Sequence, residues 1–154
     1  MKKLSYIIII LINILMFSCL SCNFAPGSYP YVELYEFQVS EPTLIKAVNI
    51  FKTENKIYCL PEQKRFIDGR INEGSQWYHV WFYYPQENQI VKCWIRTSYK
   101  GNAELGLIGI GNGMSLDDYK EINKDFSIQE NKMQKNKFEL RIINEIKKQI
   151  KKLQ

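Results

Sequence analysis

The stretch WYHVWFYY at 77–84, followed by PQEN at 85–88 and QIVKCWIRT at 89–97, decides the fold of this chain. Both outer runs are rich in aromatic and β-branched residues, which favour strands. A short polar connection between two such runs is typical of a β-hairpin. We therefore predict two antiparallel strands joined by a turn at 85–88.

Side chains alternate between the two faces of a strand, so the hairpin sorts its residues into two sets. One face of the first run carries aromatic residues and the only histidine of the chain: Trp77, His79, Trp81 and Tyr83. In the second run we expect a core face made by Val91, Cys93 and Ile95. The residues between them are expected to be amphipathic and partly exposed: Lys92, Trp94 and Arg96.

The remaining elements follow from hydrophobic periodicity. Alternating patterns predict strands over 31–39, 64–67 and 104–110, and apolar stripes predict helices over 40–54 and 131–153. The stretch 112–131 is polar and is predicted to be a loop. The order β-α-β-β-β-β-α predicts an α+β domain: an antiparallel β-meander with an N-terminal helix and a long C-terminal helix packed on one face.

The C-terminal helix carries most of the positive charge. From residue 132 onward there are eight basic and two acidic residues, a net charge of +6, although the whole chain has only +5. Such a helix can lie on an anionic membrane surface or bind an acidic protein. The interpretation we favour is a domain helix that covers the sheet with one apolar stripe: Phe138, Ile142, Ile143, Ile146, Ile150 and Leu153.

The first residues have the pattern of an export signal. Lys2 and Lys3 precede an apolar run over 4–17, which ends in small residues and cysteine. A transmembrane helix needs about 20 apolar residues, whereas the apolar part of a signal peptide needs about 7–15. The run falls in the shorter class, so we predict a signal peptide over 1–21.

The residues SCLSC at 18–22 resemble the lipobox of bacterial lipoproteins, in which small residues precede a cysteine that receives a lipid. Cys22 has Ser21 and Leu20 before it, which fits that pattern better than Cys19 does after Phe17. The resemblance implies that Cys22 is lipidated. We then expect a Pro/Gly-containing tether over 22–30 and a single domain over 31–154.

The mature chain is similar to the small lipoproteins of Bacteroidota-type bacteria. The similarity rests on SCNFAPGSYPYVELYEF at 21–37, DGR at 68–70 and WYHVWFYYPQENQIVK at 77–92. It implies a cell-envelope protein held to a membrane by its lipid, and no particular activity. In lipoproteins of this kind, acidic residues after the lipidated cysteine direct export to the cell surface. The resemblance therefore implies the periplasmic side of the outer membrane, because 23–27 contains no acidic residue.

Once Cys19 is removed and Cys22 is lipidated, Cys59 and Cys93 remain. In an oxidising compartment two such cysteines can pair, and the alternative is two free thiols. Spacing in sequence does not decide between them, because a disulfide requires the two Cβ atoms to meet.

The sequence contains no pattern of catalytic or metal-binding residues, and we predict a non-enzyme without a cofactor. His79 lacks an accompanying nucleophile motif and is read as a structural or exposed strand residue. The glycines at 106, 109, 111 and 113 do not have the spacing of a dinucleotide-binding loop. Glycine within a strand more often marks a bulge or close packing against a large aromatic ring.

Two functions are compatible with these features. The first is a lipid-anchored interaction domain that binds a protein of the cell envelope and no nucleic acid. The alternative is a module that binds carbohydrate or peptidoglycan on an exposed aromatic sheet face: Trp77, Trp81, Tyr83 and Trp94. Exposure of these rings separates the two hypotheses, since buried rings cannot form a sugar platform.

Overall fold

The central hairpin forms where the sequence predicts it. In the computed structural model, which describes residues 29–61 and 66–154, strand β3 spans Tyr78–Tyr84 and β4 spans Gln89–Thr97. The two strands pair antiparallel from Tyr84 opposite Gln89 to Tyr78 opposite Ile95. The predicted signal peptide and Cys22 lie outside the described residues.

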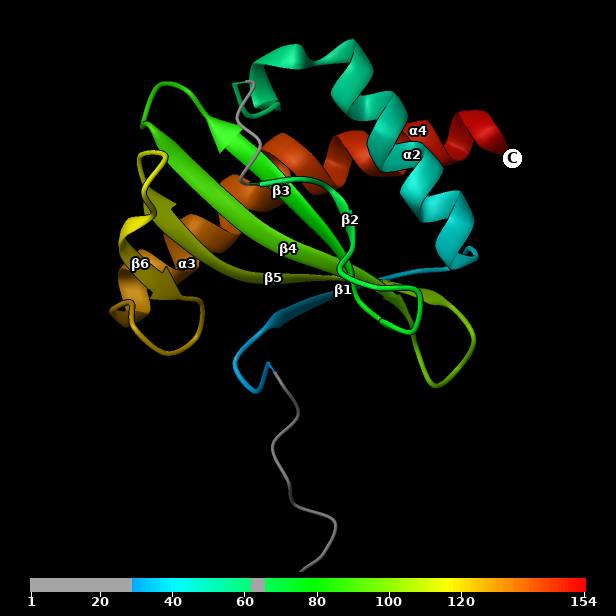
Figure 1. The fold of residues 1–154 in the computed structure, drawn as a ribbon, viewed down its shortest axis with the longest axis horizontal. Coiled ribbons are helices and arrows are strands. Elements are labelled where there is room, and N and C mark those ends of the chain that lie inside the picture. Colours follow the sequence, from blue (N-terminus) through cyan, green and yellow to red (C-terminus); the bar gives the residue numbers. More distant parts are fainter. Residues whose placement is uncertain (1–28, 62–65) are drawn as a thin grey trace, which may run out of the picture. The chain divides into compact units, whose positions relative to one another are not determined.

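The hairpin is the centre of an antiparallel sheet with the strand order β2-β3-β4-β5-β1 (Figure 1). Strand β5 (Ala103–Asn112) pairs with β4 along its length, and β1 (Glu33–Phe37) pairs with the first half of β5. Strand β6 (Asp117–Glu121) pairs with the second half of β5. The predicted strand over 104–110 is thus confirmed and is somewhat longer.

Two predictions about this sheet are wrong. The short edge strand β2 lies at Gly69–Arg70 rather than at 64–67, of which residues 64 and 65 lie outside the described part. Strand β6 occupies part of the predicted loop 112–131. Its sequence DDYKE has no apolar alternation, so the pattern did not predict a strand. The strand is defined by its backbone pairing with β5, and its Tyr119 packs on Gly109 of that strand.

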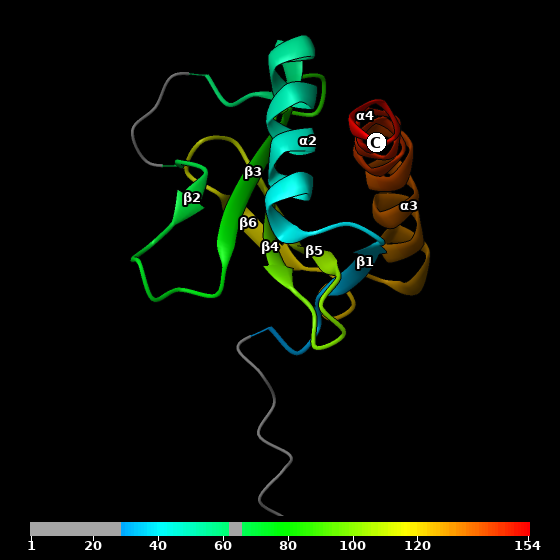
Figure 2. The ribbon, with the colours of Figure 1, turned by 90° about the vertical axis from the view of Figure 1, so that its right-hand side faces the viewer.

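Both predicted helices are present on one face of the sheet (Figure 2). Helix α2 spans Glu41–Glu54 and is followed by a 3-10 turn at Lys56–Tyr58. The C-terminal helix consists of α3 (Ile128–Phe138), a π-helical turn (Glu139–Ile143) and α4 (Asn144–Leu153). It begins before the predicted residue 131 because Ser127 and Glu130 form a capping box.

The hydrophobic core lies between the helices and the inner face of the sheet. Alternate residues of the strands point into it, as the sequence predicts for Val91, Cys93 and Ile95. The predicted stripe of the C-terminal helix is also confirmed, since Phe138, Ile142, Ile143, Ile146 and Ile150 are buried. The core is therefore built from β3, β4 and β5 on one side and both helices on the other.

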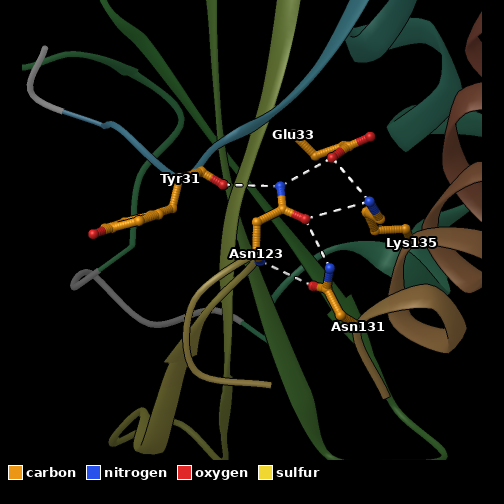
Figure 3. A network of polar contacts seen from close by, with 5 residues as sticks. All are labelled: Tyr31, Glu33, Asn123, Asn131 and Lys135. Atoms are coloured by element: carbon orange, nitrogen blue, oxygen red, sulfur yellow. Dashed lines mark hydrogen bonds and ion pairs between the residues drawn. The ribbon is translucent and has the colours of Figure 1, made fainter. Parts of the chain in front are cut away.

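A polar network joins the start of the domain to the start of α3 (Figure 3). Asn123, which has a positive φ of 61°, donates from Nδ2 to the carbonyl oxygen of Tyr31 and to Glu33. Its backbone N–H donates to Asn131 Oδ1, and Lys135 forms an ion pair of 3.1 Å with Glu33. The beginning of β1 is thereby fixed to the first turns of α3.

The two remaining cysteines are free thiols rather than a disulfide. Cys93 is fully buried in the core on β4, where burial raises the pKa of its thiol. Cys59 follows the 3-10 turn and donates from Sγ to the carbonyl oxygen of Lys52 at 3.4 Å. Of the two alternatives that the sequence left open, the structure has the free thiols.

Candidate functional site

The outer face of the sheet, opposite the helices, is built from three rows of residues across β3, β4 and β5. His79 lies opposite Trp94 and Trp81 opposite Lys92, while Tyr83 lies opposite Ile90. Each of these β4 residues in turn lies opposite a glycine of β5: Gly106, Gly109 and Gly111 respectively. In these three rows, large side chains of β3 and β4 therefore lie beside positions of β5 that have no side chain.

The glycines allow other side chains to pack directly on the β5 backbone. A Cβ atom at Gly106 would lie 2.5 Å from the ring of Trp94, and one at Gly109 would lie 2.6 Å from the hydroxyl of Tyr119. The third, Gly111, is covered by Leu116. This confirms the interpretation that glycines of this strand allow close packing against large side chains.

One end of the outer face is a closed structural cluster. The guanidinium of Arg96 lies 5.0 Å from the ring centre of Trp77 and 4.9 Å from that of Trp94. Its Nε donates to Glu104 at 3.0 Å, and this carboxylate is 3% exposed. Trp94 itself is 1% exposed, so the prediction that it is partly exposed is wrong: Gly106 lets its ring sink onto β5, and Trp77 and Arg96 pack against it.

Beside this cluster, toward β2, the outer face holds a pocket of about 430 Å³. Its walls come from the edge segment around β2 and from the middle rows of β3 and β4. The lining residues are Ile67, Asp68, Gly69, Arg70, Ile71, His79, Trp81 and Lys92.

Two charged residues of this pocket are already engaged. Asp68 accepts a hydrogen bond of 2.9 Å from the backbone N–H of Trp81 and forms an ion pair with Lys52. Lys52 also donates to the carbonyl oxygen of Trp81 at 2.6 Å, so the pair covers the backbone of β3 beyond the end of β2. Arg70 is bound to Glu41 and to the carbonyl oxygen of Ser75.

Lys92 and His79 are the polar groups of the pocket that remain without such partners. Among the described residues, Lys92 Nζ makes no hydrogen bond or ion pair and lies 5.6 Å from the ring centre of Trp81. His79 is 8% exposed, and its buried Nδ1 has no hydrogen-bond partner within the described part of the chain. Buried polar groups in folded proteins are almost always paired, so the unpaired Nδ1 of His79 is an exception. Lys92 is half-buried and lines the pocket, where its ammonium can meet a ligand.

The pKa values of both side chains are lowered, as expected for basic groups that are partly buried. Burial lowers the pKa of Lys92, and the charge of Glu121 offsets only part of that change. Burial also lowers the pKa of His79, with a further contribution from the positive charge of Lys92. An anion placed between them would favour the protonated form of each.

The rim of the pocket is apolar. The ring of Trp81 is half-buried and packs against Phe66 at 4.7 Å between ring centres. Ile67 and Ile71 are 72% and 79% exposed. The pocket thus combines the imidazole of His79 and the ammonium of Lys92 with apolar side chains at its edge. This combination suits a ligand in which an acidic group lies next to an apolar group.

The predicted aromatic face is divided by the structure into different roles. Trp81 lines the pocket, whereas Trp77 and Trp94 belong to the Arg96 cluster. The fourth residue, Tyr83, is half-buried and donates from its hydroxyl to Asn88 Oδ1 in the hairpin turn. The four rings do not make one exposed surface.

Sequence reasoning missed Lys92 and Asp68 as pocket residues. It placed Lys92 on the correct face of β4, but pairing of β3 with β4 in register was needed to bring it beside Trp81. Asp68 was recognised only as part of a turn, and its bond to the backbone of Trp81 depends on where β2 meets β3. Pairing the two predicted strands outward from the turn at 85–88 would have placed Lys92 beside Trp81. The same pairing says nothing about the position of Asp68.

The described residues contain no group of three or more metal-ligating side chains, and none of their helices has the length and apolar character needed to cross a membrane. Comparison of the chain with family models, with curated proteins and with solved structures gave no match.

Proposed function

We propose that this protein is a lipid-anchored, non-enzymatic binding domain of the cell envelope, and that its outer sheet pocket binds an acidic group of a partner protein. The observation that carries the proposal is one pocket that is lined by His79 and by Lys92, whose ammonium has no ion pair among the described residues. The signal peptide predicted over 1–21 and the resemblance of 18–22 to a lipobox with Cys22 as the lipidated residue support the location. The apolar rim supports a peptide ligand.

The charges of the pocket favour an anionic ligand. Asp68 is neutralised by Lys52 and Arg70 by Glu41, so Lys92 is the remaining charge at the pocket surface. A carboxylate can accept hydrogen bonds from both an ammonium and an imidazole N–H, and charge-assisted bonds of this kind are the stronger ones. A partner segment with one acidic residue next to an apolar residue would satisfy floor and rim together.

Site-specific photo-cross-linking tests the proposal. A photoreactive benzoylphenylalanine in place of Ile71, at the exposed rim, is expected to form an adduct with a protein in living cells. Mass spectrometry of the adduct identifies the bound chain. The adduct should be lost when Lys92→Met is added and kept when Lys46→Met, at an exposed residue of α2, is added as the matched control. Absence of an adduct, or one that is indifferent to Lys92→Met, would contradict the proposal.

Binding of carbohydrate or peptidoglycan is the second candidate, favoured by the half-exposed ring of Trp81 beside the pocket. A sugar could stack on the single ring of Trp81, so further binding energy would have to come from polar contacts. The carboxylates of a peptidoglycan peptide could make such contacts with Lys92. In the same experiment this candidate predicts an adduct that is shortened by peptidoglycan-digesting enzymes rather than by a protease.

A further inference from the structure

The outward side of the C-terminal helix forms a surface that the core does not use. Residues of α3 and α4 that point away from the buried isoleucines line two shallow, adjoining depressions, which share Leu140. We call this surface the outer helix face: Gln129, Lys132, Met133, Asn136, Leu140, Asn144, Lys147, Lys148 and Lys151.

This face exposes large apolar side chains. Leu140 is 69% exposed and Met133 58%, and they are seven positions apart, so they lie on the same side of the helix. Ile128, in the first turn of α3, is 92% exposed. The buried stripe already accounts for the contact of the helix with the sheet, so these residues are not needed to complete the core.

The same face is strongly basic. Four of its residues are lysines, and Lys148 is paired with Glu145 at 2.6 Å. Lys137 and Arg141 border it and are bound to Glu87. Exposed apolar residues between lysines are the arrangement by which a helix lies on an anionic membrane surface, with apolar side chains among the lipid headgroups and ammonium groups beside their phosphates.

A lipid on Cys22 would limit how far the start of this helix can lie from the membrane. The domain begins at Tyr31, and the Asn123 network ties Tyr31 and Glu33 to Asn131 and Lys135 of α3 (Figure 3). From Cys22 to Tyr31 the chain can extend by at most about 30 Å. A lipid on Cys22 would therefore keep Tyr31, which the network joins to the first turns of α3, within about 30 Å of the bilayer.

We propose that the outer helix face lies against a membrane that contains anionic phospholipid when the domain is held there by its lipid. This inference rests on the proposed lipid attachment at Cys22. It assigns α3 and α4 two opposite surfaces, one that closes the core and one that orients the domain. The outer sheet pocket, on the other side of the sheet from the helices, would then remain open to a partner.

The test uses the mature lipidated protein in vesicles of phosphatidylcholine with or without phosphatidylglycerol. An environment-sensitive fluorophore is attached at Met133→Cys in a Cys59→Ser background, and a matched control carries it at Ile71→Cys. We expect a blue shift of the emission at position 133 in phosphatidylglycerol vesicles and none at position 71. The fourfold variant Lys132→Gln, Lys147→Gln, Lys148→Gln, Lys151→Gln should abolish the shift.

Flotation of the vesicles separates this inference from the function it rests on. If the protein does not float with the vesicles, and the mass of its mature N-terminus shows no lipid on Cys22, the anchor itself is refuted. If the protein floats and position 133 gives no shift, or the fourfold variant keeps the shift, the outer helix face does not bind the membrane. In the unlipidated Cys22→Ser protein, each lysine removed should weaken vesicle binding about fivefold.

Discussion

The two faces of the sheet are made from alternate residues of the same strands and differ in almost every physical property. On the inner face, Val80 and Phe82 are fully buried against the helices in a continuous apolar core. On the outer face, the residues next to them, His79 and Trp81, line a pocket with Lys92. The inner face thus supplies most of the stability, whereas the outer face joins the closed Arg96 cluster to a pocket whose Lys92 has no ion pair among the described residues.

The largest effect we predict separates the faces with two adjacent residues of β3. Phe82→Ala removes a fully buried ring and should lower the free energy of unfolding by about 3–5 kcal/mol. Trp81→Ala removes a half-buried ring on the other face and should cost about 1 kcal/mol. Urea denaturation of both variants measures the difference. Equal losses would show that the outer face is part of the core.

The second prediction concerns the glycines of β5. Gly106→Ala places a Cβ atom 2.5 Å from the ring of Trp94, and we expect overpacking to cost about 1–3 kcal/mol. Gly74→Ala is the control, because the nearest atom to its Cβ would be 3.8 Å away. Thermal unfolding of the two variants tests this. A Gly106→Ala protein as stable as the control would mean that Trp94 can leave its place on β5 freely.

A smaller effect is expected from pH. Because burial holds the pKa of His79 below its ordinary value of 6.5, the unfolded chain binds a proton more readily than the folded one. Stability from this residue is therefore complete above about pH 6.5 and declines as the pH falls through the folded-state pKa. In His79→Gln this component of the acid destabilisation should disappear. Denaturation curves between pH 5 and 8 compare the two proteins, and identical pH profiles would oppose the prediction.

The smallest predicted effect on stability comes from Lys92→Met. Lys92 has no ion pair or hydrogen bond among the described residues, so its removal should change the free energy of unfolding by no more than about 0.5 kcal/mol. Binding of the acidic partner should nevertheless be lost. Urea denaturation and the cross-linking experiment, applied to the same variant, check both halves of this statement. A marked loss of stability would make Lys92 a structural residue.

Much of this fold could be predicted from residue patterns, and the failures have physical causes. The hairpin and both helices follow from strong periodicity, as with the stripe from Phe138 to Ile150. Strand β6 was missed because its charged residues face solvent and only its backbone pairing defines it. Trp94 was expected to be exposed because its burial depends on Gly106, a residue of another strand.

The candidate site was only partly predictable for the same reason. Trp81 was placed on a binding face by alternation alone. The unpartnered state of Lys92 and His79 emerges only when β2, β3 and β4 are assembled, because it depends on Asp68 and Arg70 being bound to other residues. Local patterns identify which face a residue occupies, and three-dimensional assembly decides which polar groups remain unsatisfied.

The most direct test of the central claim, that the outer sheet pocket binds an acidic group, uses the only histidine of the chain as a probe. Nuclear magnetic resonance of the ¹⁵N-labelled imidazole follows His79 while N-acetyl-leucyl-aspartate amide is added, with the uncharged asparagine analogue as control. We predict a saturable shift of the ring nitrogens and a raised pKa of His79 with the aspartate compound, both absent in Lys92→Met. A ring signal that does not respond, or responds equally to the asparagine analogue, would contradict the claim.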